Sequence, residues 1–125
     1  MLLFSTPRFT EHTPPPGHPE RPERAEVFDA VARAFASRGG VVREPRPATR
    51  DELARVHTAA YLDALEGVAG RAAMLDPDTF TSPESHEIAR LAAGAAIDAA
   101  HHAWTTGEPA FALGSGAQLP NRFAT

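Results

Sequence analysis

Residues 82–113 carry the strongest structural signal in this chain: S-P-E-S-H-E-I-A-R-L-A-A-G-A-A-I-D-A-A-H-H-A-W-T-T-G-E-P-A-F-A-L. Ser82 fits a helix N-cap and Pro83 the first helical position, and Gly107 fits a C-terminal stop. Between them, apolar residues recur at i, i+3, i+4 spacing, which predicts a long helix. The apolar stripe consists almost entirely of small residues: Ile88, Leu91, Ala92, Ala95, Ala96 and Ala99.

Such a stripe suits a helix that lies flat against a sheet, because small side chains let two backbones approach closely. Gly94 lies within it, although glycine costs about 1 kcal/mol relative to alanine in a helix interior. A packing reason for Gly94 is therefore expected. Residues 110–113, A-F-A-L, follow the helix and predict a short buried strand. A helix that leads into a buried strand is half of an α/β unit.

The remaining elements extend this α/β pattern without an internal repeat. Glycine, proline and capping signals set most of their ends. The apolar faces predicted for the two further helices are Val27, Phe28, Val31, Ala32 and Phe35 in the first, and Leu53, Val56, Ala60, Leu62 and Leu65 in the second. In chain order the sequence predicts a strand at 2–4, a proline-rich loop at 12–24, a helix at 25–37, a strand at 41–42, a helix at 49–67 opened by a T-x-x-E capping box, and a turn-rich loop at 76–83.

Composition narrows the functional classes. The chain has 125 residues, of which 42% are hydrophobic, and no apolar run approaches the ~20 residues of a membrane span. We therefore expect one domain, no membrane partner and, since Met1–Phe4 is too short for a signal-peptide core, a cytoplasmic location. The absence of cysteine excludes disulfides and thiolate metal sites. A net charge of −4 with scattered arginines gives no reason to expect a nucleic-acid partner.

No motif in the residues specifies a catalytic centre. His86-Glu87 begins like the zinc-protease motif, but Arg90 replaces its second histidine. The adjacent histidines at 101–102 point about 100° apart on a helix, so they are interpreted as surface residues. His57 and Tyr61 are interpreted as a partly buried, hydrogen-bonded pair. Three weaker signals stay open between a ligand contact and an ordinary turn: Asp76, Asp78 and the glycine-rich segment 114–116.

Five segments, taken together and in order, resemble the N-terminal third of the zinc-dependent histone deacetylase family. The likeness covers residues 1–113 and is strongest to class II and to bacterial acetoin-utilisation or acetylpolyamine-hydrolysing members. It implies an arginase–deacetylase-type α/β fold with helices on both faces of a parallel sheet. The segments are G-H-P-E-R-P-E-R (17–24), V-H-T-A-A-Y-L (56–62), D-P-D-T-F-T-S-P-E-S (76–85), L-A-A-G-A-A (91–96) and G-E-P-A-F-A-L (107–113).

The resemblance also assigns roles to three loop residues. It implies that His18 and Pro19 form one wall of the tunnel that admits an acetylated lysine or polyamine. It places Asp78 at the tunnel rim, where the family holds the substrate with a polar or acidic side chain. His57, Tyr61 and Gly94 match family positions that are structural. The implied cofactor of the intact family is zinc, and the implied partner is the acetylated substrate.

The likeness stops where the family's catalytic residues begin. After F-A-L the family continues V-R-P-P-G-H-H-A, whose two histidines perform acid–base catalysis. Here Leu119 and Pro120 fall at those positions, and the family's zinc ligands and tyrosine would lie beyond Thr125. We therefore expect residues 114–125 to form a divergent, disordered tail, and this chain to provide no catalytic residue, no metal ligand and no bound cofactor.

Two functional hypotheses follow from this departure. The chain is either a piece of a zinc deacylase that is inactive alone, or a non-enzymatic interaction module or remnant. In the family, the strand matching 110–113 has neighbours on both sides. Without them its edge would be exposed, so we expect a marginally stable chain that self-associates through that sheet edge.

Overall fold

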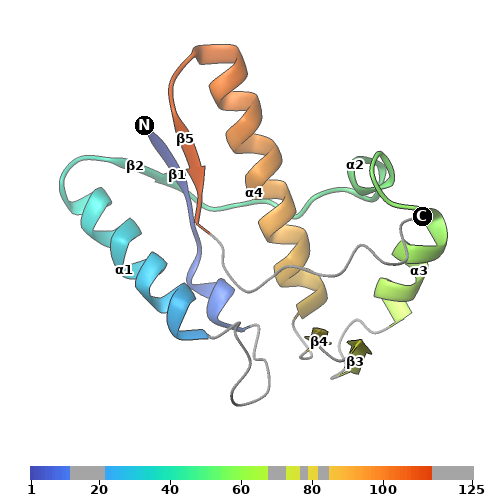
Figure 1. Ribbon diagram of the computed structural model, residues 1–125. Coiled ribbons are helices and arrows are strands. Elements are labelled where there is room, and N and C mark those ends of the chain that lie inside the picture. The colour runs from blue at the N-terminus through green and yellow to red at the C-terminus, as the bar shows by residue number, and fades with distance from the viewer. Residues whose placement is uncertain (12–21, 68–72, 77–78, 82–84, 114–125) are drawn as a thin grey trace.

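Three parallel strands form the central sheet of the computed structural model, which describes residues 1–11, 22–67, 73–76, 79–81 and 85–113 (Figure 1). The strands β1 (Leu2–Phe4), β2 (Val41–Arg43) and β5 (Ala110–Ala112) lie in the order β2-β1-β5. Leu3 of the central strand is in register with Val42 on one side and Phe111 on the other. All three residues of β1 are buried, as expected for a strand covered on both faces.

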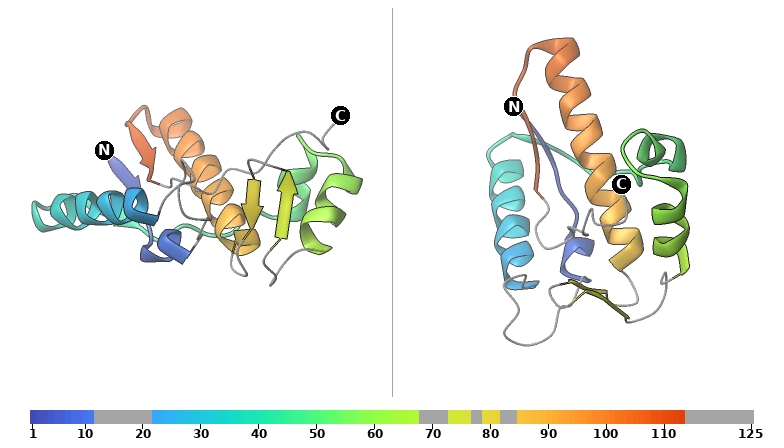
Figure 2. Two further views of the ribbon diagram at one scale, coloured as in Figure 1. Left: turned by 60° about the horizontal axis from the view of Figure 1, so that its bottom comes forward. Right: turned by 45° about the vertical axis from the view of Figure 1, so that its right-hand side comes forward.

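Two long helices cover opposite faces of this sheet, α1 (Pro22–Ser37) and α4 (Ser85–Thr106) (Figure 2). The predicted α/β class is therefore confirmed. The other described elements are a 3₁₀ helix, η1 (Pro7–Glu11), the short helices α2 (Arg50–Ala54) and α3 (Ala59–Gly67), and an antiparallel hairpin of β3 (Ala73–Asp76) and β4 (Thr79–Thr81). The hairpin lies close to the first turn of α4 in Figures 1 and 2.

The helix α4 packs on the sheet through the small-residue stripe that the sequence indicates. Ala95 and Ala99 pack with Leu2 and Phe4 of the central strand, and Ala110 of β5 adds to this cluster. The helix ends at Thr106, and Gly107 adopts a φ of 73°, the left-handed conformation expected after a helix C-terminus. The predicted helix and its stop are confirmed. The proposed cap at residues 82–83 lies outside the described residues.

Gly94 lies where α4 meets the backbone of the segment that leads to α2. A Cβ atom built at Gly94 would lie 1.8 Å from the carbonyl oxygen of Arg46. Two further contacts hold the segment there: Ala48 N donates to Arg90 O at 2.8 Å, and the Arg90 guanidinium donates to Ala48 O at 2.9 and 3.0 Å. Only a glycine permits this approach, so the packing reason expected for Gly94 is confirmed.

The single helix predicted for residues 49–67 is wrong, because the chain forms two helices there. The capping box is present: Thr49 Oγ1 accepts from Glu52 N at 3.1 Å, and Glu52 Oε1 accepts from Thr49 N at 2.9 Å. However, Thr58 Oγ1 accepts from Tyr61 N at 3.2 Å and starts α3 as a second N-cap. Val56, predicted to be buried, lies in the connection and is 72% exposed.

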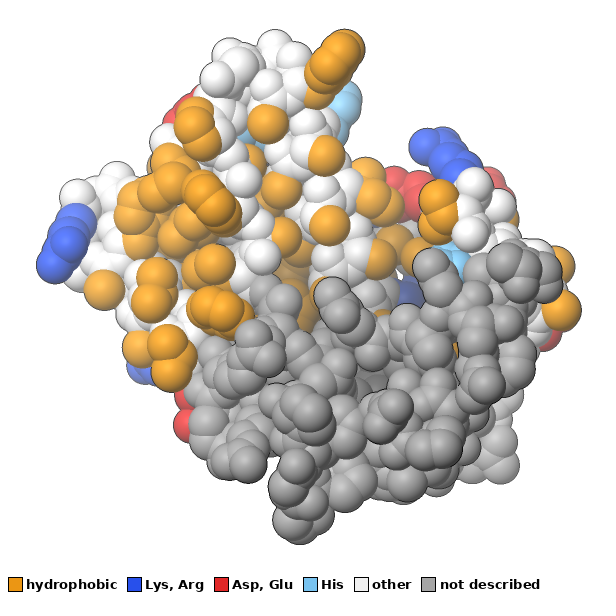
Figure 3. All heavy atoms as spheres, in the orientation of Figure 1, with side chains coloured by type: hydrophobic (Ala, Val, Ile, Leu, Met, Phe, Trp, Pro, Cys, Tyr) orange, Lys and Arg blue, Asp and Glu red, His pale blue; other side chains and the backbone are white. Residues whose placement is uncertain are grey.

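Three further predictions need correction. The helix α1 begins at Pro22, within the segment predicted as loop, because proline suits a first helical turn. Of the predicted apolar face of α1, Ala32 is buried, but Val27 and Val31 are exposed. The strand β5 is not buried, since it lies at the sheet edge and Phe111 is 53% exposed. Figure 3 shows hydrophobic side chains gathered on the face over α1 and β5. The β3–β4 hairpin was not predicted.

An ion-pair network fastens the segment before α2 to both α2 and α4. The Arg46 guanidinium donates to both carboxylate oxygens of Glu52, at 2.7 and 2.9 Å, and to Asp98 of α4 at 3.0 Å. The hydrogen bonds from Arg46, followed by the one from Thr49 N, lower the pKa of Glu52 from 4.5 to about 2. These contacts keep the Arg46 backbone carbonyl close to Gly94.

Acid should therefore weaken the fold through Glu52. Because its pKa is lower in the folded chain, its contribution is fully present above the unfolded pKa and is lost as pH falls towards about 2. We expect the urea midpoint of the wild type to decrease as the pH is lowered from roughly 5 to 2. The midpoint of Glu52→Gln, which keeps an acceptor for the cap, should decrease less steeply. Asp51→Asn on the same helix is the control. Equal slopes for wild type and Glu52→Gln would contradict the assignment.

No helix among the described residues is long and apolar enough to cross a membrane.

Candidate functional site

The carboxyl ends of the three parallel strands lie at the same end of the sheet, which is where ligands bind in open α/β folds. Here β1 ends at Phe4, and the chain continues into Ser5 and Thr6, both buried polar residues. Ser5 N donates to the carbonyl oxygen of Arg43 at 3.1 Å, so the ends of β1 and β2 stay joined beyond the strands. The segments that follow β1 and β2 therefore start from strand ends that are hydrogen-bonded to each other.

The first of these segments is η1, which Thr6 starts and Phe9 anchors. Thr6 Oγ1 accepts from Arg8 N at 3.3 Å, and the carbonyl oxygen of Thr6 accepts from Phe9 N at 3.3 Å. The Phe9 side chain is 2% exposed and packs with Ile88 and Leu91 of α4. Phe9 was not among the predicted site residues, although burial of a large aromatic side chain is strongly favourable.

An ion pair joins η1 to the first turn of α4. Arg8 Nη1 donates to Glu87 Oε1 at 3.0 Å, and this contact lowers the pKa of Glu87. Glu87 also lies at the helix N-terminus, where a negative charge is favourable. The segment with His18 and Pro19 follows η1, and Asp78 stands between β3 and β4, upstream of α4. All three predicted site residues lie outside the described residues, so their roles stay predictions.

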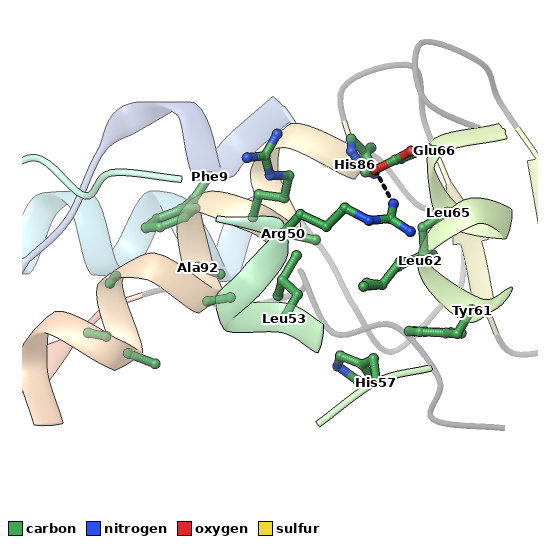
Figure 4. Close-up of a pocket in the computed structure, with 16 residues that line it drawn as sticks. Phe9, Arg50, Leu53, His57, Tyr61, Leu62, Leu65, Glu66, His86 and Ala92 are labelled. Atoms are coloured by element: carbon green, nitrogen blue, oxygen red, sulfur yellow. Dashed lines mark hydrogen bonds and ion pairs between the residues drawn. The ribbon is translucent and has the colours of Figure 1, made fainter. Parts of the chain in front are cut away.

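A cavity of about 430 Å³ opens between α4 and the pair α2–α3 (Figure 4). Alanines of α4 line one wall, and leucines together with polar side chains of α2 and α3 line the other. Arg50 joins α2 to α3 by donating to Glu66 at 2.7 Å and to Asp63 at 2.8 Å. The hydrogen bond to Asp63, then that to Glu66, raises the pKa of Arg50. Burial, aided by the nearby positive charge of Arg90, lowers the pKa of His86.

His57 and Tyr61 line the same cavity and are in contact through their rings. The ring centroids are 4.8 Å apart with an angle of 37° between the planes. The predicted pairing is therefore correct, but within the described residues the contact is a tilted ring pair and not the expected hydrogen bond. Within the described part of the chain, His57 Nδ1 is buried without a hydrogen-bond partner.

The two histidines near the end of α4 behave as predicted. His101 is exposed, and His102 Nε2 lies 3.1 Å from Glu108 Oε2 in a surface contact. Across the described residues, no three His, Cys, Asp or Glu side chains come together closely enough to hold a metal ion. The described residues therefore do not fit the zinc ion that the family resemblance implies.

Comparison with known proteins decides the family. Residues 18–118 match the model of the histone deacetylase domain. The chain belongs to the histone deacetylase family. Its structure superposes on the crystal structure of the HDA15 HD domain with a TM-score of 0.75 and 29% sequence identity, covering 90% of this chain and 34% of that one. The expected arginase–deacetylase-type sheet with helices on both faces agrees with this match.

Two curated relatives of this family member are described as probable deacetylases. The one from Methanothermobacter thermautotrophicus is 36% identical over 110 residues, which cover 86% of this chain and 32% of the relative. The one from Archaeoglobus fulgidus is 36% identical over 95 residues, which cover 74% of this chain and 26% of the relative. The chain therefore spans about a quarter to a third of the length of these two relatives.

Proposed function

We propose that this chain is the N-terminal, substrate-facing part of a zinc-dependent deacetylase domain that hydrolyses an acetylated amine. The family match over residues 18–118 is the observation that carries the proposal. The junction of η1 and α4, held by Phe9 and by the pair of Arg8 and Glu87, would position the loops on either side of the substrate tunnel. In this proposal His18 and Pro19 form a tunnel wall, and Asp78 accepts a hydrogen bond from the substrate.

We further propose that the 125-residue polypeptide does not turn over substrate by itself. Amide hydrolysis needs a polarised water, a base to deprotonate it and a donor to the developing oxyanion. The positions that match the family's two histidines hold Leu119 and Pro120, and neither can transfer a proton. Acetyl-lysine and acetylpolyamine are both candidate substrates. We propose a cytoplasmic location for the chain with either substrate.

A chimera tests the deacetylase assignment. Residues 1–113 would replace the matching segment of the Methanothermobacter relative, and hydrolysis of an acetyl-lysine peptide and of acetylated spermidine would be measured. We expect turnover by the chimera and none by the 125-residue chain. A folded chimera that hydrolyses neither substrate would refute the assignment. Turnover and stoichiometric zinc in the purified 125-residue chain would refute the proposed inactivity.

The same chimera tests the role of Asp78. Asp78→Ala should raise KM about tenfold or more, since a hydrogen bond to a charged group contributes about 1.5–3 kcal/mol. Asp76→Ala is the matched control, because it removes the other carboxylate beside Pro77 and should leave KM unchanged. Equal effects of the two substitutions would show that loop stability, rather than substrate contact, explains the result.

A further inference from the structure

We draw no further inference here: the strongest candidate, the cavity between α4 and the pair α2–α3, is lined in part by Ala112 of β5, one residue before the described chain ends, and nothing in the structure shows what covers it.

Discussion

Replacing Gly94 by alanine will lower the free energy of unfolding by about 3 kcal/mol or more, a large value for the addition of one methyl group. The new Cβ would lie 1.8 Å from the Arg46 carbonyl oxygen and 3.0 Å from Ala48 N. Both atoms are backbone, so relief requires α4 or the segment 46–48 to move. Movement would break the bonds that Arg90 makes with Ala48, because these set the same separation.

Urea denaturation of Gly94→Ala measures this effect, and Gly67→Ala is its control. Gly67 is also helical, and a Cβ atom there would meet nothing within 4 Å. Helix propensity alone favours alanine by up to about 1 kcal/mol, so Gly67→Ala should be neutral or slightly stabilising. If Gly94→Ala were as stable as wild type, α4 and the segment before α2 would not be in the contact described above.

Phe9→Ala should be comparably damaging, with a loss of about 3–5 kcal/mol from the free energy of unfolding. Phe9 is 2% exposed and packs with Ile88 and Leu91, so its removal leaves a void between η1 and α4. We therefore expect increased protease cleavage within η1 in addition to a lower urea midpoint.

Trp104→Ala provides the comparison for Phe9→Ala. Both substitutions remove a large aromatic side chain, but Trp104 is 90% exposed at the end of α4. Its loss should change the free energy of unfolding by no more than about 0.5 kcal/mol. Phe9→Leu retains most of the apolar volume, so its free energy of unfolding should lie between those of Phe9→Ala and Trp104→Ala. This variant should remain folded even where Phe9→Ala does not. Similar midpoints for Phe9→Ala and Trp104→Ala would contradict the packing of η1 on α4.

The local signals along the chain predicted the elements but not all their boundaries. The alanine-rich stripe, Gly107 and the capping box at Thr49 led to correct assignments because each depends on residues close in sequence. The division of the second helix was missed, although the Thr58 side chain caps Tyr61 N and starts α3. Exposure of Val31 was missed for a different reason: which face of α1 is buried depends on the strands beneath it.

The candidate site was predicted less completely. Motif resemblance led to the correct family, and it assigned His18, Pro19 and Asp78 to the substrate tunnel, where they stay predictions. The contacts that hold the surrounding segments could not be predicted: Arg8 and Glu87 are 79 positions apart, and each alone is an ordinary surface charge. No local pattern relates two such residues, because only the packing of η1 on α4 brings them together.

By itself, the sequence determined the α/β class, the family, and the residue types that a helix lying flat on a sheet requires. The fold class and the residue types follow from short-range spacing and composition, whereas the family follows from the resemblance of five segments to known motifs. Tertiary structure alone decided that Phe111 is half exposed and that Gly94 faces a backbone carbonyl. The physical reason is that burial and close approach are properties of two surfaces, and the second surface is distant in sequence.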